Sequence, residues 1–105
     1  MENPNLNYID ELSGGDIEFK NKLISIIKEE FPKEKELYYK LLGLQDYKLV
    51  AEIVHKLKHK ISILGLEKSY NVATNYENNL KLGNPNLKDQ FDVIMMTISN
   101  YLIKI

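Results

Sequence analysis

The sequence contains no cysteine, so disulfide bonds, thiolate metal sites and cysteine nucleophiles are all excluded. No apolar run approaches the roughly 20 residues that a membrane-spanning helix needs. The first residues, Met-Glu-Asn-Pro-Asn, lack the basic and apolar regions of a signal peptide. A net charge of −1 gives no overall attraction for nucleic acid. These absences predict a soluble, cytoplasmic protein without membrane or nucleic-acid partners.

Several catalytic and ligand-binding motifs are also missing. The chain has no Ser-His-Asp triad signal, no P-loop, no glycine-rich nucleotide motif and no DxDxDG calcium loop. Sustained alternation of apolar and polar residues, which would indicate β-strands, does not occur either. The sequence therefore favours an all-α protein that does not bind a nucleotide by a known motif.

What the chain does contain is a helical spacing of apolar residues along its whole length. With 105 residues, 44% apolar and 28% charged, it has the composition of one folded domain, residues 1–105. We expect a polar tail at 1–5 and helices near 6–12, 16–43, 46–64, 66–80 and 91–105. Four long helices with short connections predict an antiparallel up-down-up-down four-helix bundle, with the short N-terminal helix across one end.

Individual residues mark where these helices begin and end. Asp16 and Asp46 are predicted N-caps, because each carboxylate precedes an apolar helical pattern. Pro32 is expected to kink the second helix without ending it, since the apolar pattern resumes directly after it. Gly43 is the predicted left-handed residue after that helix, and Gly65 the predicted turn after the next one.

The apolar spacing also predicts which side chains form the core. The third helix should bury Val50, Ile53, Leu57, Ile61 and Leu64, and the last helix should bury Phe91, Ile94, Met95, Ile98, Leu102 and Ile105. The second helix has an additional apolar row, Ile17, Ile24 and Phe31, beside its main stripe. Packing within the molecule is the favoured interpretation of this row, and a docking patch is the alternative.

Both histidines lie opposite the predicted core of the third helix. At about 100° per residue, His55 is central on the polar face, and Lys58 and His59 lie near it, three and four residues later. Neighbouring lysines favour a neutral imidazole, and a neutral imidazole is a competent nucleophile. A phosphoryl group on His55 would carry about two negative charges, which Lys58 is placed to pair.

These residues resemble a known family. His55-Lys-Leu-Lys58 followed by Leu64-Gly65 resembles the signature of histidine-containing phosphotransfer (HPt) domains, H-x-L-K-G with a second glycine further on. The segment 8–16, Tyr-Ile-Asp-Glu-Leu-Ser-Gly-Gly-Asp, is similar to the beginning of the family pattern, and Phe31-Pro32 is similar to its proline-bearing first long helix. The likeness covers most of the chain.

The resemblance implies a function. His55 would accept a phosphoryl group from the aspartyl phosphate of a response-regulator receiver domain and pass it to another, and Lys58 would pair with the phosphate. The expected partners are receiver domains and a hybrid sensor histidine kinase. The chain would be a monomer with no cofactor and no kinase activity of its own, because Mg²⁺ would come with the receiver domain.

One position departs from the family pattern. His59 stands where the family usually has a glycine that leaves the phosphorylation site open. Its imidazole could select among receivers, bond the phosphate when protonated, or mark a degenerate site. The family also tends to place a polar side chain of the following helix near the histidine, and Glu77, Asn78 and Lys81 are the candidates here.

Four other interpretations compete with the relay. His55 among its lysines could be an ordinary solvated helix face, because most charged stretches lie on the surface. A non-catalytic helical adaptor would keep the bundle and the partner surface without phosphotransfer. A zinc ion on His55 and His59 is suggested by their i, i+4 spacing, but only Glu52 is near enough to be a third ligand and the lysines oppose a cation. A nucleic-acid patch at the lysines is disfavoured, because no aromatic residues lie among them.

Overall fold

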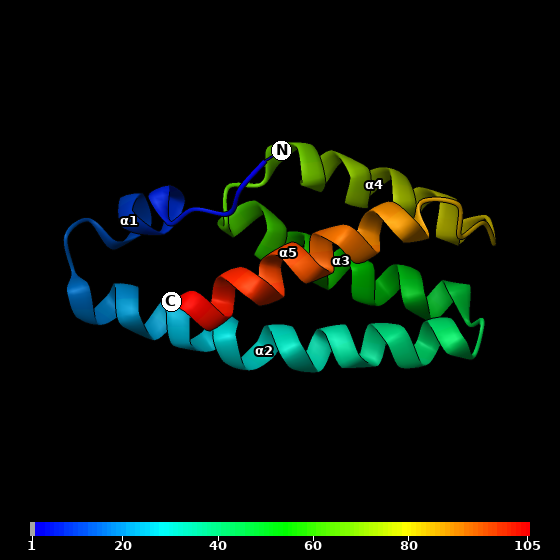
Figure 1. Cartoon of the computed structure of the whole chain (residues 1–105), viewed down its shortest axis with the longest axis horizontal. Helices are drawn as coiled ribbons and strands as arrows, with labels where there is room; N and C mark the ends of the chain where they lie inside the picture. The colour runs from blue at the N-terminus through cyan, green and yellow to red at the C-terminus, as the bar shows by residue number, and fades with distance from the viewer. Residues whose placement is uncertain (1) are drawn as a thin grey trace.

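The computed structural model describes residues 2–105, and within that range it contains five helices and no strand (Figure 1). This confirms the predicted all-α class and the short N-terminal helix. In chain order the helices are α1 (Asn7–Ser13), α2 (Ile17–Gly43), α3 (Tyr47–Ile63), α4 (Glu67–Lys81) and α5 (Lys88–Lys104).

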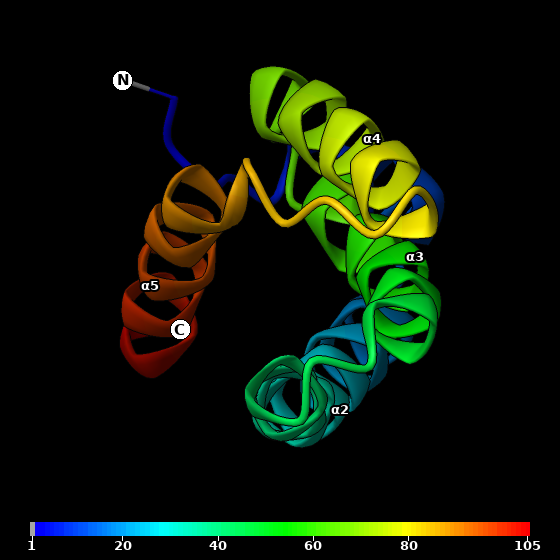
Figure 2. The ribbon, with the colours of Figure 1, turned by 90° about the vertical axis from the view of Figure 1, so that its right-hand side faces the viewer.

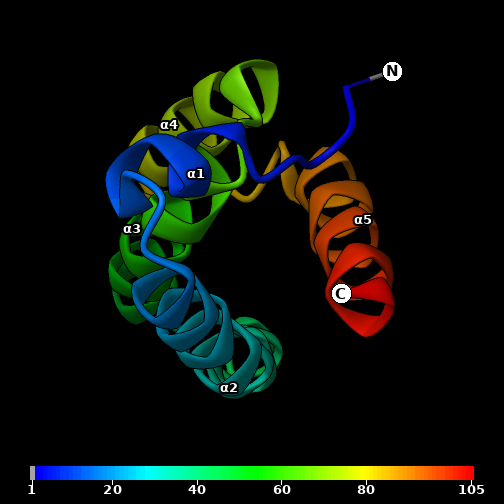
Figure 3. The same ribbon diagram turned by 90° about the vertical axis from the view of Figure 1, so that its left-hand side faces the viewer.

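The four long helices follow one another around a common core. The two end views show α2, α3, α4 and α5 in this order, with α1 at the end where α3 connects to α4 (Figures 2 and 3). No helix among residues 2–105 combines the length and apolar character needed to cross a membrane.

Both predicted aspartate caps are confirmed. Asp16 Oδ1 accepts a hydrogen bond from the Phe19 backbone N–H at 3.1 Å, and Asp46 Oδ1 accepts one from the Leu49 N–H at 3.3 Å. Each cap satisfies one of the N–H groups that the first turn of a helix leaves without a partner. The start of α3, and with it the position of His55, is therefore fixed locally by Asp46.

α2 ends at Gly43, as predicted, but Gly43 is not the left-handed residue that follows the helix. Gly43 is still helical, and the left-handed residue is Gln45, with φ of 57°. The Asp46 N–H bonds the Leu41 carbonyl, and the Gln45 N–H bonds the Leu42 carbonyl, which is the Schellman pattern. That pattern requires its left-handed residue two positions after Gly43. The glycine, which adopts a positive φ most easily, is therefore not at the position that needs it.

Pro32 lies inside α2 without ending it, as predicted. A proline at this position removes the hydrogen bond that the Lys28 carbonyl would otherwise accept. Both residues are exposed, so the interruption lies on the solvent side of the helix. The core side continues with Tyr38, which is fully buried.

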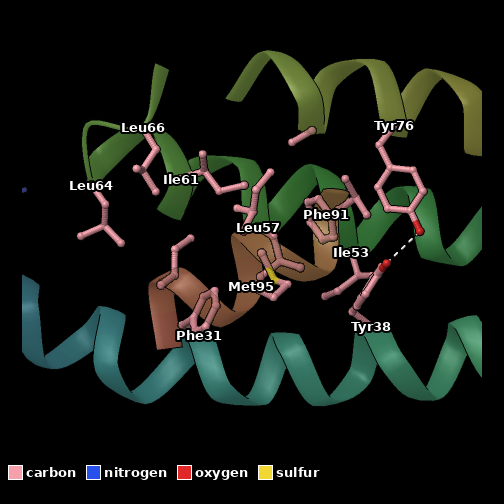
Figure 4. Close-up of a cluster of buried hydrophobic side chains, with 14 of the residues drawn as sticks. Phe31, Tyr38, Ile53, Leu57, Ile61, Leu64, Leu66, Tyr76, Phe91 and Met95 are labelled. Atoms are coloured by element: carbon pink, nitrogen blue, oxygen red, sulfur yellow. Dashed lines mark hydrogen bonds between the residues drawn. The ribbon is translucent and has the colours of Figure 1, made fainter. Parts of the chain in front are cut away.

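The core combines side chains of all five helices. Figure 4 shows the part in which α2 faces α3, α4 and α5, with Phe31, Tyr38, Leu57, Ile61, Tyr76, Phe91 and Met95 packed together. All five core residues predicted for the third helix are at most 4% exposed; four lie in α3, and Leu64 is the residue directly after it. Ile105 is an incorrect prediction: α5 ends at Lys104, and Ile105 is 38% exposed.

The additional apolar row of α2 is divided between core and surface. Phe31 is buried and Ile24 is partly buried against the core, so the interpretation as internal packing holds for them. Ile17 is 72% exposed, and the interpretation is wrong there. Ile17 is the first residue of α2, directly after the turn from α1, where neighbouring helices do not cover it.

The N-terminal segment caps α4. Leu66 occupies the cap position of α4 and has no side chain that could accept a hydrogen bond. Glu2 supplies the missing acceptor, because its two carboxylate oxygens receive the Lys68 and Ser69 N–H groups at 2.8 and 2.9 Å. Burial raises the pKa of Glu2, but these backbone hydrogen bonds outweigh it, so the pKa lies below its usual value.

Asn5 ties the same segment to the turn between α3 and α4. Its backbone N–H donates to the Leu64 carbonyl at 2.9 Å, and its side chain lies against Gly65, where a Cβ would be 2.6 Å from the amide nitrogen. Residues 2–5 of the predicted polar tail have no regular secondary structure, but two of them, Glu2 and Asn5, are bound to the start of α4 and to the turn before it. Met1, the first residue of that tail, lies outside the described residues.

Candidate functional site around His55 and Glu77

His55 lies near the middle of α3, on the side turned away from the core. Its side chain is 57% exposed, whereas Leu57, two residues later, is fully buried. His59 is also exposed. The predicted polar face of α3 is confirmed at both histidines, and the periodicity of the helix is the reason.

Lys58 is placed differently from the sequence prediction. It lies beside His55 in the helix, but its side chain is only 11% exposed. Its Nζ donates to Glu77 Oε1 at 3.1 Å and lies 5.2 Å from the centre of the Tyr70 ring. Both partners belong to α4, which covers this edge of the polar face of α3. A helical wheel of α3 alone does not contain that contact.

Glu77 is the residue of α4 that reaches the histidine. Its carboxylate contacts His55 Nδ1 at 3.3 Å, Lys58 Nζ at 3.1 Å and Lys81 Nζ at 3.2 Å. Of the three candidates on this helix, Asn78 is exposed and makes none of these contacts. The site is therefore one buried carboxylate with three nitrogen donors around it.

The charge of Glu77 follows from these contacts. Glu77 is only 5% exposed, and burial by itself raises the pKa of a carboxyl group. Hydrogen bonds from Lys58, Lys81 and His55 act in the opposite direction and outweigh burial, so the pKa of Glu77 lies below its usual value. Glu77 is an anion at neutral pH.

The contact with Glu77 determines which nitrogen of His55 is free. An ionised carboxylate can only accept hydrogen bonds, so Nδ1 must carry the hydrogen that faces it. In a neutral imidazole the lone pair then belongs to Nε2, on the other side of the ring.

The lysines of the 55–60 stretch do not form one continuous basic surface. Lys58 is paired with Glu77, and Lys60 points to α2, where Glu30 and Glu34 accept from its Nζ at 2.9 and 3.2 Å. Burial lowers the pKa of Lys60, but the two carboxylates outweigh burial and raise it. Lys56 is exposed. The local positive potential expected from three lysines is therefore reduced by three glutamates that lie on other helices.

His59 lies one turn after His55 on the same face. The two rings are 5.4 Å apart between centroids and meet edge to face. His59 therefore places a second imidazole beside His55, at the position where the HPt pattern has a glycine. Within residues 2–105, no group of three or more metal-binding side chains comes together, and Glu52 does not complete a zinc site with the two histidines.

A groove of about 920 Å³ extends from His55 along the contact between α3 and α4. Tyr47, Ala51, Leu80 and Gly83 give it an apolar lining. Its other residues are polar and charged: Lys48, Glu52, His55, Lys56, Glu77 and Lys81. A partner that approached His55 from this side would meet an apolar floor with three lysines and two glutamates around it.

Among the three candidates on α4, Glu77 has a distinguishing signal in the sequence. It is the one charged residue on the otherwise apolar inward face of α4. A carboxylate at such a position requires buried cationic partners, but the sequence of α4 does not say which ones. Tyr70, against which Lys58 lies, gave no signal, because a tyrosine on an apolar face is an ordinary core residue.

Comparisons with protein-family models, with curated proteins and with solved structures found no match to this chain.

Proposed function

We propose that this chain is a phosphorelay intermediate of the HPt type, in which His55 accepts a phosphoryl group from a receiver-domain aspartyl phosphate and passes it to a second receiver. The observation that carries the proposal is an exposed imidazole whose Nδ1 faces a buried carboxylate. This contact leaves the Nε2 lone pair as the nucleophile. The resemblance of His55-Lys-Leu-Lys58 to the HPt signature supports the same assignment.

The proposed transfer is balanced without a further reactant. The Nε2 lone pair of His55 forms a bond to phosphorus, and the bond from phosphorus to the aspartyl oxygen breaks, returning its electron pair to the receiver carboxylate. The ring keeps its Nδ1 hydrogen and becomes positively charged. Glu77 faces that hydrogen and stabilises the new charge. Transfer to a second receiver is the same step in reverse.

The proposed fold is an antiparallel up-down-up-down four-helix bundle. Its support is the three-residue connections at 44–46 and 64–66, together with the contacts between helices that follow each other in the chain. Such a bundle holds α3 on two sides and leaves His55 on the third. The proposed module is a cytoplasmic monomer, whose partners are receiver domains and a hybrid sensor histidine kinase.

The receiver brings the remaining chemistry in this proposal. Mg²⁺ and the aspartyl phosphate belong to the receiver, and the chain contributes a nucleophile, a carboxylate and lysines. The groove beside His55 suits a partner with an apolar helix and acidic residues near its active site.

A non-catalytic adaptor is the second candidate, and His59 is the observation that favours it. Its ring stands 5.4 Å from that of His55 and occupies space beside the proposed nucleophile. In an adaptor the groove and its lysines would still bind a receiver, but the aspartyl phosphate would not reach Nε2.

Phosphoryl transfer from phosphorylated receivers tests the relay. Wild-type chain is mixed with receiver domains that carry an aspartyl phosphate in the presence of Mg²⁺, and intact mass is measured before and after acid treatment. We expect one acid-labile, base-stable phosphoryl group. His55→Gln should abolish it while binding to the receiver is retained.

His59→Gln is the matched control, because it changes the other exposed histidine of the same helix. The relay predicts that this variant still accepts the label. Labelling that depends on His59 instead of His55 would show that His59, and not His55, is the nucleophile. Binding of a receiver without any label on the wild-type chain would establish the adaptor.

A further inference from the structure

The two lysines that contact Glu77 differ in solvent exposure and in their access to the groove beside His55. Lys58 and Lys81 are 3.1 and 3.2 Å from the carboxylate, so both pair with it at rest. The Lys58 side chain is 11% exposed and does not line the groove beside His55. The Lys81 side chain is 60% exposed and does line it.

We propose that Lys81, and not Lys58, pairs with the phosphoryl group on His55. This inference rests on the proposed function and assigns the roles within the same site. Lys58 is a positioning residue that keeps Glu77 ionised against His55 Nδ1. Lys81 is the residue that contacts the transferred group.

The position of the nucleophilic nitrogen supports this division. Nδ1 faces Glu77, so a phosphoryl group on Nε2 lies on the side of the ring away from the carboxylate. A lysine has to leave Glu77 to reach it. Lys58 is buried between α3 and α4, and removing it from its carboxylate would leave a buried cation without a partner. Lys81 is an exposed side chain at the last residue of α4, and an exposed ion pair is readily exchanged.

Phosphorylation itself favours the exchange. Glu77 Oε2 contacts both Lys81 Nζ and His55 Nδ1 at rest. When the His55 ring becomes positively charged, its attraction to Glu77 Oε2 becomes stronger. Loss of the Lys81 contact then costs that oxygen less free energy. The phosphoryl group carries about two negative charges, more than the single charge of the carboxylate. Lys81 therefore moves from Glu77 to the phosphoryl group as the transfer proceeds.

The test uses chain phosphorylated by phosphoramidate, a small donor that requires no receiver. Trypsin cleaves after Lys56 and Lys58, so His55 and His59 fall in different peptides and the labelled histidine is identified directly. The pKa of the phosphoryl group is then measured by phosphorus NMR in wild type, Lys81→Met, Lys81→Arg and Lys56→Met. Lys56 is the matched control, because it is another exposed lysine of the same groove.

A paired cation lowers the pKa of a phosphoryl group, so the expected changes have a definite sign. Lys81→Met should raise that pKa by about 0.5 to 1, Lys81→Arg should restore it, and Lys56→Met should leave it unchanged. The transfer equilibrium with a receiver should move toward the receiver by about three- to fivefold in Lys81→Met, as the loss of an exposed ion pair implies.

A second measurement avoids variants that fail to fold. The side-chain carbon and proton resonances of Lys81 should shift on phosphorylation of the wild-type chain, and those of Lys58 should shift less. A larger shift at Lys58, or a phosphoryl pKa that Lys81→Met leaves unchanged, overturns the inference. Failure of the relay looks different, because receivers then do not label the wild-type chain while phosphoramidate still does. A chain that phosphoramidate cannot label at His55 contradicts both proposals.

Discussion

Replacing Glu77 by glutamine should destabilise the protein far more than replacing a surface glutamate. Glu77 is 5% exposed and is the carboxylate partner of Lys58, whose side chain is 11% exposed. Removing one member of a buried ion pair typically costs about 3 to 5 kcal/mol, since the other charge stays buried without compensation. Glutamine keeps the shape and one acceptor, so we expect a loss of about 3 kcal/mol in the free energy of unfolding.

A double-mutant cycle separates the pair from the rest of the site. Lys58→Met should cost about 1 kcal/mol, because Glu77 still has Lys81 and His55 as donors. The double variant Lys58→Met, Glu77→Gln should cost about 2 kcal/mol, which is less than the sum of the single changes. With a total stability of about 5 to 15 kcal/mol, each variant should remain folded.

Urea unfolding followed by far-UV circular dichroism is the suitable assay, because the chain contains no tryptophan. Glu29→Gln is the matched control. Glu29 is also a helical glutamate paired with a lysine, Lys33, at 3.6 Å, but its side chain is 72% exposed. Glu29→Gln should therefore change the free energy of unfolding by at most about 0.5 kcal/mol. A Glu77→Gln loss as small as this, or additive losses at positions 58 and 77, would refute the reasoning.

The difference in stability between wild type and Glu77→Gln should depend on pH, and the direction of this dependence can be predicted. The folded pKa of Glu77 lies below its unfolded value, so its contribution is fully present above the usual glutamate pKa of about 4.3 and is lost as pH falls through the folded pKa. The stability difference between wild type and Glu77→Gln should therefore shrink as pH decreases below about 4.3. Other carboxylates are present in both proteins and cancel. A difference that is constant with pH would contradict the assignment of an ionised Glu77.

Two further predictions concern the core and the turn after α3. Tyr38 and Tyr76 are fully buried and share one hydrogen bond of 2.7 Å. Tyr38→Phe or Tyr76→Phe alone should lower the free energy of unfolding by about 1 to 3 kcal/mol, because the remaining hydroxyl is left without its partner. In the same urea assay, the double variant should lose less than the sum of the two single losses. Gly65→Ala should lower the melting temperature more than Gly83→Ala does. Both glycines have a positive φ, but only at Gly65 would the added Cβ meet another side chain, that of Asn5. Equal melting temperatures of the two variants would be evidence against the Asn5 contact.

Local chemistry explains most of what the sequence predicted correctly. Asp16 and Asp46 are confirmed caps, because an N-cap acts on backbone groups only three residues away. The core face of α3 was predictable for the same kind of reason, since helix geometry alone places Ile53, Leu57 and Ile61 together. The exposure of His55 follows from the same periodicity.

The incorrect predictions depend on contacts between distant parts of the chain. The N-terminal segment was predicted only as a polar tail, but Glu2 reaches the first turn of α4, 66 positions away along the chain. Ile17 looked like part of an apolar row, but the neighbouring helices do not extend over the first turn of α2. Periodicity describes one helix, and it contains no information on how far its neighbours reach.

The sequence by itself determined the helices, the aspartate caps of α2 and α3, and the face of α3 that carries His55. Only the tertiary structure decided what surrounds this histidine: it chose Glu77 among three candidates, buried Lys58 and left Lys81 in the groove. The physical reason is the range of the interactions. Helix formation and capping by an adjacent aspartate act within about four residues, whereas the electrostatics of the site depend on a carboxylate of a different helix, 22 residues away from His55 in the sequence.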